Sequence, residues 1–242
     1  MFLFGLLVLV VCTPLVLVSL LFAAAHWPAM DRFTMALPMD VRTTIAEMAM
    51  SNAGYGKDAD KKLERVVRLD PRNSTARGRI CVDAEDKGTA SAAEACRLAV
   101  ELAPTEWNLN ALGLTEERAG DPCTAEDTFT KANSKANGGN SNFLRNMGRA
   151  ALECGRVAYS VAELEAAKAI DAKWVDDPDE GDDFKANLKS DQEWLTVAYE
   201  ANKQPKLAAE ACVKAHPEWK SCGCALRDGK AVCRETPLGA AR

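Results

Sequence analysis

The stretch LGLTEERAGDPCTAEDTFTKA, residues 112–132, carries a pattern of small and large apolar residues that returns elsewhere in the chain. Residues of the same kinds occur 35 positions later in the chain. The second half of the pattern also occurs 33 positions earlier, and again 33 positions before that. Regular return at such a length indicates a repeat architecture. The matched positions are Gly113, Gly120, Ala125, Phe129 and Ala132; Gly148, Gly155, Ser160, Leu164 and Ala167; Ala92, Cys96 and Ala99; and Ala59, Leu63 and Val66.

Each repeat is predicted to be a pair of amphipathic helices, because apolar residues recur every three or four positions and Gly or polar residues separate the two halves. A small residue lets the paired helix approach closely, while Leu or Phe one turn later fills the groove. Pro71 and Pro104 end two of the repeats. The predicted fold class is all-α, a solenoid of helix-turn-helix repeats, and a generic Ala-rich helical bundle is the alternative. A looser fifth repeat contains Leu195, Tyr199, Ala208, Cys212 and Ala215.

These residues resemble the tetratricopeptide repeat family, which repeats about every 34 residues. Leu112-Gly113 followed by Gly120 and Phe129 matches the family pattern well, and Met147-Gly148 opens a second good match. The resemblance covers residues 41–220 and implies four or five stacked helix pairs whose first helices line a concave surface for peptides or partner helices. It also implies that Cys81 faces Cys96 within one helix pair, and that Cys123 reaches Cys154 in the neighbouring pair.

Eight cysteines lie beyond the first 25 residues, an even number that indicates disulfides and an oxidising compartment such as the periplasm. Asp228-Gly229 is typical of a two-residue hairpin turn, and counting outward from it pairs Cys224 with Cys233. That pairing leaves Cys222 for Cys212, and residues 221–242 are predicted to be a cysteine-rich hairpin and tail. The alternative is a metal site, with ligands from Cys212, His216, Cys222, Cys224 and Cys233.

Residues 2–25 contain no charged side chain, and this run is long enough to cross a bilayer. We therefore expect a transmembrane signal-anchor helix over residues 1–27, followed by a linker over 28–40. The alternative is a cleaved signal peptide. Arg32 and Arg42 favour a cytoplasmic domain by the positive-inside rule, whereas the cysteines favour an extracytoplasmic one, and the cysteines carry more weight here.

The composition argues against catalysis and against nucleic-acid binding. The two histidines, His26 and His216, belong to no recognisable catalytic motif, and no phosphate-binding loop is present. A net charge of -5 disfavours a phosphate-backbone binder. The acidic stretch 174–184 lacks the ligand spacing of a calcium loop and is predicted to be a solvated insertion. No enzyme, metal or cofactor is therefore expected.

A partner-binding groove is predicted on the first helices of the later repeats. One predicted helix carries Asn142, Arg145, Asn146 and Arg149 at positions i, i+3, i+4 and i+7, so these four residues share a face. Arg and Asn suit a carboxylate or a backbone amide, and Trp suits an apolar anchor, although a plain solvated helix face is the alternative. The predicted residues are Asn142, Arg145, Asn146 and Arg149, flanked by Trp107 and Asn110 on one side and by Glu193 and Trp194 on the other.

The first functional hypothesis is a membrane-anchored, non-enzymatic scaffold that binds protein partners and helps to assemble or stabilise a membrane complex outside the cytoplasm. The second is a secreted peptide- or glycan-binding module whose first 25 residues are removed. The third is a metal-dependent or redox factor that uses the cysteines near the carboxyl terminus.

Overall fold

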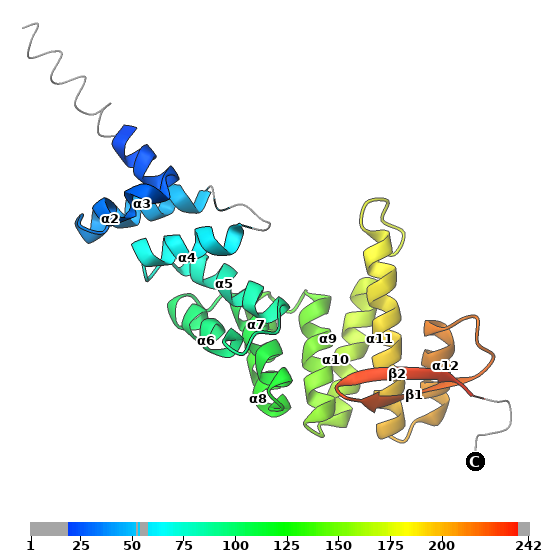
Figure 1. Ribbon diagram of the computed structural model, residues 1–242. Coiled ribbons are helices and arrows are strands. Elements are labelled where there is room, and N and C mark those ends of the chain that lie inside the picture. The colour runs from blue at the N-terminus through cyan, green and yellow to red at the C-terminus, as the bar shows by residue number, and fades with distance from the viewer. Residues whose placement is uncertain (1–18, 52, 54–57, 237–242) are drawn as a thin grey trace, which may run out of the picture. The chain divides into compact units, whose positions relative to one another are not determined.

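The computed structural model describes residues 19–51, 53 and 58–236, and Figure 1 shows their helices. The chain divides into two compact units, residues 1–103 and 104–242. In the first unit residues 19–26 are helical. The remaining elements of that unit are the 3-10 turn η1 (Pro28–Met30), α2 (Asp31–Thr34), α3 (Met39–Ser51), α4 (Ala59–Leu69), α5 (Ser74–Asp86) and α6 (Ala92–Leu102).

The second unit continues the alternation of helices and ends in two strands. Together the described residues contain five successive helix pairs, α3 with α4 through α11 with α12, as the resemblance implied. The elements of this unit are α7 (Glu106–Arg118), α8 (Pro122–Lys135), α9 (Ser141–Glu153), α10 (Val157–Asp171), α11 (Gly181–Ala201), α12 (Pro205–Ala215), β1 (Cys222–Arg227) and β2 (Lys230–Glu235).

Short polar side chains begin several of the first helices. The side chains of Asn73, Thr105 and Asn140 accept hydrogen bonds from backbone N–H groups in the first turns of α5, α7 and α9. These groups have no partner within the helix, so the caps satisfy them. Gly120 and Gly155, which follow α7 and α9, have φ of 83° and 86°, a conformation that favours glycine. Local sequence therefore determines where these helices start and turn.

Close contact between paired helices explains the small residues of the repeat. A Cβ atom on Gly148 would lie 2.7 Å from Cγ of Leu164 in the paired helix α10. Leu164 and Phe129 are fully buried, as are Ala125 and Ala132 of α8. The recurring Gly and Ala positions are therefore the points at which two helix backbones approach each other.

The segments expected to be a linker and an acidic loop both contain helix. Residues 28–40 include η1, α2 and the first turn of α3. The acidic stretch 174–184 begins with turns, but α11 starts at Gly181, so Asp182 and Asp183 lie in its first turn. Carboxylates are stabilising there because they face the positive end of the helix dipole. Part of the insertion thus lengthens the first helix of the fifth pair.

Four disulfides join the described cysteines, two in the pairs that the family resemblance implied and two in the pairs expected from the hairpin turn. Cys81–Cys96 links α5 to α6, and Cys123–Cys154 links α8 to the residue after α9. β1 and β2 form an antiparallel hairpin in which Cys224 is opposite Cys233, and Asp228-Gly229 turns with positive φ at both residues. The remaining bonds are Cys212–Cys222 and Cys224–Cys233.

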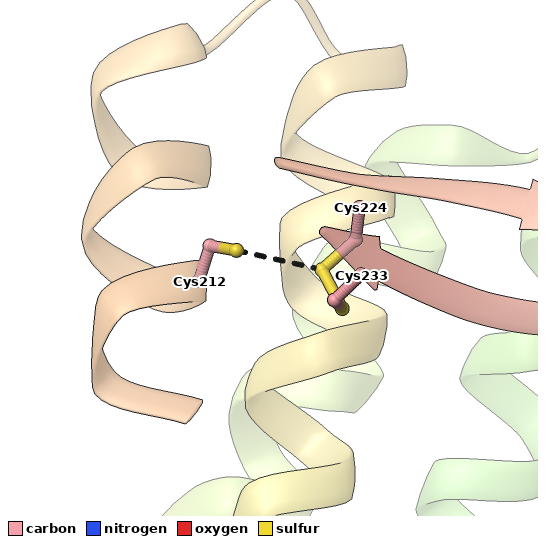
Figure 2. A group of neighbouring side chains, drawn as sticks. All are labelled: Cys212, Cys224 and Cys233. Atoms are coloured by element: carbon pink, nitrogen blue, oxygen red, sulfur yellow. Dashed lines mark hydrogen bonds between the residues drawn. A yellow bond between two sulfur atoms is a disulfide. The ribbon is translucent and has the colours of Figure 1, made fainter. Parts of the chain in front are cut away.

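The hairpin is attached to the last helix pair. Figure 2 shows the Cys224–Cys233 bond beside Cys212 of α12, with the Sγ atoms of Cys212 and Cys224 3.6 Å apart. Cys222 and Cys224 are buried in the same apolar core as Trp194 and Leu195 of α11. The two disulfides therefore hold the hairpin against the end of the helical stack.

The predicted transmembrane segment lies mainly outside the described residues, of which it includes only 19–27. Among the helices that the structure describes, none combines the length and the apolar character needed to cross a bilayer.

Candidate partner-binding surface

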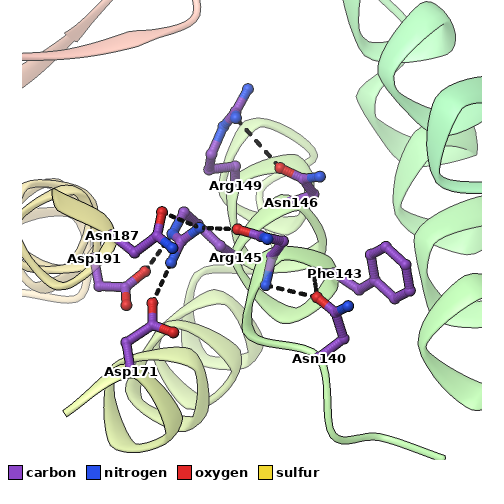
Figure 3. A network of polar contacts seen from close by, with 9 residues as sticks. Asn140, Phe143, Arg145, Asn146, Arg149, Asp171, Asn187 and Asp191 are labelled. Carbon is purple, nitrogen blue, oxygen red and sulfur yellow. Dashed lines mark hydrogen bonds and ion pairs between the residues drawn. The ribbon is translucent and has the colours of Figure 1, made fainter. Parts of the chain in front are cut away.

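A row of polar and aromatic side chains crosses α7 and α9, the first helices of two neighbouring pairs. Trp107 is 56% exposed, and its ring meets that of the buried Phe143 edge-on at 5.2 Å. Further along, Asn146 Nδ2 donates to Asn110 Oδ1 at 2.9 Å. Figure 3 shows Asn146 in turn accepting from Arg149 Nη1, at 3.4 Å. These contacts place Trp107, Asn110, Asn146 and Arg149 along one surface.

Arg149 ends this row between an acid and an aromatic ring. Its Nη2 donates to Glu117 Oε2 of α7 at 2.9 Å, and its guanidinium carbon lies 5.0 Å from the ring centre of Trp194. Burial raises the pKa of Glu117, and the charge of Arg149 opposes that rise. Glu117 Oε1 is buried without a hydrogen-bond partner in the structure. The charge of Arg149 is thus already balanced within the protein.

Arg145 belongs to an internal network and does not face the groove. It is buried, and its guanidinium donates to Asp171 of α10 and to Asp191 of α11, each at 2.5 Å. It also donates to Asn142 at 2.6 Å. A longer bond of 3.5 Å reaches Asn187 (Figure 3). A charge removed from water needs such partners. The predicted binding role of Arg145 is therefore replaced by one that holds three helices together.

The carboxyl group of Asp191 in this network has a raised pKa. Burial raises the pKa of Asp191 to about 7, although the hydrogen bond and charge of Arg145 act in the opposite direction. The nearby carboxylate of Asp171 adds to the rise. Both aspartates are fully buried.

Glu193 and Trp194 turn toward the hairpin end of the unit. Glu193 Oε1 lies 3.0 Å from Nε2 of His216, whose ring stacks on Trp219 at 3.9 Å. Trp194 is only 6% exposed and packs in the core beside Cys222. Trp194 therefore packs its ring against the guanidinium of Arg149 and is not exposed enough to bind a partner's side chain.

The eight predicted groove residues fall into two groups: five lie on the surface of the first helices, whereas Arg145, Glu193 and Trp194 make the contacts described above. Trp107, Asn110, Asn142, Asn146 and Arg149 remain on the first-helix surface, with Asn142 exposed. Glu117 completes the surface and was missed by the sequence interpretation. Its signal was present, because Glu117 follows Asn110 by seven residues, as Arg149 follows Asn142, and this spacing keeps both pairs on one helix face.

The cysteines considered as metal ligands are engaged in disulfides. The Sγ atoms of Cys212, Cys224 and Cys233 lie within 4.8 Å of one another, as do ligand atoms of Glu193, His216 and Cys233. A metal-ligating cysteine is a free thiolate, whereas these sulfur atoms form the Cys212–Cys222 and Cys224–Cys233 bonds. In this oxidised form the cluster attaches the hairpin to α12.

No protein-family model matches the sequence, and no curated protein matches it at a significant level. Solved structures are similar in fold. One structure of MamA shares 16% identity with a TM-score of 0.55, covering 74% of this chain and 91% of its own. YrrB, described as a tetratricopeptide repeat protein with an unusual peptide-binding site, shares 14% identity with a TM-score of 0.54, covering 75% of this chain and 88% of its own.

These likenesses span most of both chains, and they agree with the helix pairs and the glycine contacts described above. The chain therefore has the tetratricopeptide repeat fold.

Proposed function

We propose that this protein is a non-enzymatic scaffold that binds a partner protein along the first helices α7 and α9. The observation that carries the proposal is the continuous row Trp107, Asn110, Asn146 and Arg149 on consecutive first helices. Helical solenoids bind ligands on extended concave surfaces, which the family resemblance assigns to the first helices. The peptide-binding description of the similar protein YrrB agrees with this use of the fold.

The surface favours an extended peptide segment with an apolar side chain. The Asn110 and Asn146 amides can exchange their mutual hydrogen bond for bonds to a peptide backbone, since each carries both donors and an acceptor. Trp107 offers an exposed ring to an apolar side chain. Because Glu117 already balances Arg149, an internal segment suits the site better than a free carboxyl terminus.

The proposal includes attachment to a membrane. The charge-free run 2–25 would act as the anchor, and the four disulfides favour an oxidising compartment outside the cytoplasm. An anchored repeat domain that binds a segment of another membrane protein would help to assemble or stabilise a complex there.

Site-specific photocross-linking in native membranes tests the binding surface. A photoreactive residue at Trp107 or Asn142 should yield a discrete partner adduct, whereas the same residue at Lys131 or Lys135, both exposed on α8, should not. The double variant Asn110→Ala with Asn146→Ala should weaken the Asn142 adduct. Equal adducts from α8, or an adduct insensitive to the double variant, would contradict the proposed surface.

Amino-terminal sequencing of the native protein tests the anchor. A chain that begins at residue 1 or 2 and sediments with membranes after a carbonate wash is expected. A mature chain that begins near residue 26 and is found in the soluble fraction would instead support a secreted peptide-binding module.

A further inference from the structure

Large apolar side chains that face outward are gathered at the amino-terminal end of the first unit. Of the twelve such exposed side chains among the described residues, six lie between residues 20 and 39, and the others are dispersed over the rest of the chain. A concentration of this kind marks a contact surface. The six residues, here named the apolar collar, are Leu20, Phe22, Trp27, Phe33, Met35 and Met39.

The collar belongs to a folded segment that buries small residues and exposes large ones. Ala24 and Ala25 are each 3% exposed and pack with Ile45 of α3, whereas Trp27 and Phe33 are 63% and 64% exposed. A surface in contact with water alone shows the opposite preference. The arrangement therefore favours a non-aqueous contact for the outward face over exposure to water.

Arg65 of α4 holds the segment that carries the collar in place. Its side chain donates to the carbonyl oxygens of Ala24 and Ala25, both at 2.5 Å, and to Asp31 Oδ1 at 2.6 Å. These carbonyls lie at the carboxyl end of the helical residues 19–26, where a cation complements the helix dipole. These hydrogen bonds join the helical end, α2 and α4.

Positive charges border the collar. Arg42 lies beside the collar sulfurs, with Nη2 2.7 Å from Sδ of Met39 and Nη1 3.7 Å from Sδ of Met35. A cavity of about 510 Å³ adjoins Ala25 and His26 at the end of the apolar run. Its lining includes the basic residues Lys61, Lys62 and Arg68, together with Asp58 and with Arg65, whose charge is already paired with Asp31.

We infer that the apolar collar lies in the interfacial region of a phospholipid bilayer, with the bordering basic side chains at the level of the lipid phosphates. The inference rests on the proposed membrane anchor, because Leu20 and Phe22 belong to the charge-free run 2–25 and the other four collar residues follow it within 14 positions. Tryptophan favours this interface, and Lys and Arg bind the phosphates of anionic lipids. The collar would set the orientation of the first unit relative to the bilayer plane, because a single anchor helix leaves that unit free to tilt and rotate.

Hydroxyl-radical footprinting of the full-length chain tests this inference. The chain is reconstituted at one copy per nanodisc of phosphatidylcholine and phosphatidylglycerol, and oxidation is read by mass spectrometry. Each rate is divided by that of the same residue in the reduced chain in urea. Trp107 and Trp174, 56% and 50% exposed, are the internal controls for Trp27, which is 63% exposed.

Trp27, Phe33, Met35 and Met39 should be protected about fivefold or more relative to these controls, because the interface excludes much of the water. Collar residues that react as fast as Trp107 in a chain that floats with nanodiscs would overturn the inference and leave the anchor intact. Protection seen only in native membranes would assign the collar to a protein partner and overturn it too. A chain that does not float with nanodiscs would overturn the anchor and the inference together.

Discussion

A Cβ atom on Gly113 would lie 2.6 Å from Cε1 of Phe129, so α7 and α8 touch where only a hydrogen atom fits. Phe129 is fully buried and cannot move aside without disturbing its neighbours. Gly148 and Leu164 repeat the relationship in the next helix pair. This contact is the physical meaning of the recurring glycine in the sequence.

Gly113→Ala and Gly148→Ala should each destabilise the second unit. Overpacking costs about 1–3 kcal/mol, while alanine recovers up to about 1 kcal/mol of helix propensity, so we expect a net loss of about 1–2 kcal/mol. Urea unfolding followed by circular dichroism measures it. Gly139→Ala, in the loop between α8 and α9, is the control for a substitution without a clash, because its Cβ would meet nothing within 4 Å and its φ is not positive. Equal effects at Gly139 and Gly113 would refute the steric explanation.

Asp191 should make stability fall as the pH rises. Burial raises its pKa to about 7 in the folded chain, whereas the pKa of an aspartate in the unfolded chain is about 3.9. Between these values the folded state holds a proton that the unfolded state has released, so the free energy of unfolding decreases from about pH 4 to about pH 7 and then levels off.

Asp191→Asn isolates this contribution, since the amide oxygen can still accept from Arg145 but cannot titrate. Unfolding at about pH 5, 6 and 8 should show a smaller decrease in the variant than in the native chain. Asp179→Asn is the control, because Asp179 is exposed and lies before the first turn of α11. Parallel pH profiles for the native chain and Asp191→Asn would show that Asp191 does not hold the proton.

The disulfide between neighbouring repeats should stabilise the unit more than the hairpin disulfide. Cys123 and Cys154 are separated by 31 residues in sequence, and Cys224 and Cys233 by 9. Loop entropy alone then predicts about 3.7 against about 2.6 kcal/mol. The double variants Cys123→Ala with Cys154→Ala and Cys224→Ala with Cys233→Ala allow comparison by urea unfolding. A larger loss for the hairpin pair would show that packing of the hairpin on α12 outweighs loop entropy.

Removal of the Arg65 side chain should detach the helical end that precedes α2. Arg65→Ala leaves the Ala24 and Ala25 carbonyls and Asp31 without their main partner, a loss of about 1–3 kcal/mol for buried hydrogen-bonding groups left unsatisfied. Hydrogen exchange of residues 24–31 in detergent micelles should become much faster. Arg68→Ala is the control, because its contact with Asp31 is 3.6 Å long and its side chain is 63% exposed. Unchanged exchange in Arg65→Ala would mean that apolar packing suffices.

Much of the fold could be predicted because its signals are local. Gly113 and Gly148 reflect contact between helices adjacent in sequence, and Asp228-Gly229 specifies a two-residue turn whose register brings Cys224 opposite Cys233. The helical character of residues 28–40 was missed, because these elements are short and depend on Arg65 and α3 for support.

The candidate site was less predictable, because a helical period specifies a shared face and not what covers it. Asn146 and Arg149 do lie on the expected surface. Arg145 is only one position before Asn146, yet Asp171 and Asp191, 26 and 46 residues away in sequence, draw it into the interior. Trp194 is likewise buried by the carboxyl-terminal hairpin.

Local patterns along the chain specified the helix pairs, the hairpin and the charge-free segment, because each depends on residues within about one repeat. Tertiary structure alone decided which side chains of a common face remain open. It buried Arg145 between two aspartates, balanced Arg149 with Glu117, and turned the apolar collar outward. The physical reason is that exposure and pKa depend on neighbours brought together by packing, whose distance along the chain no local pattern records.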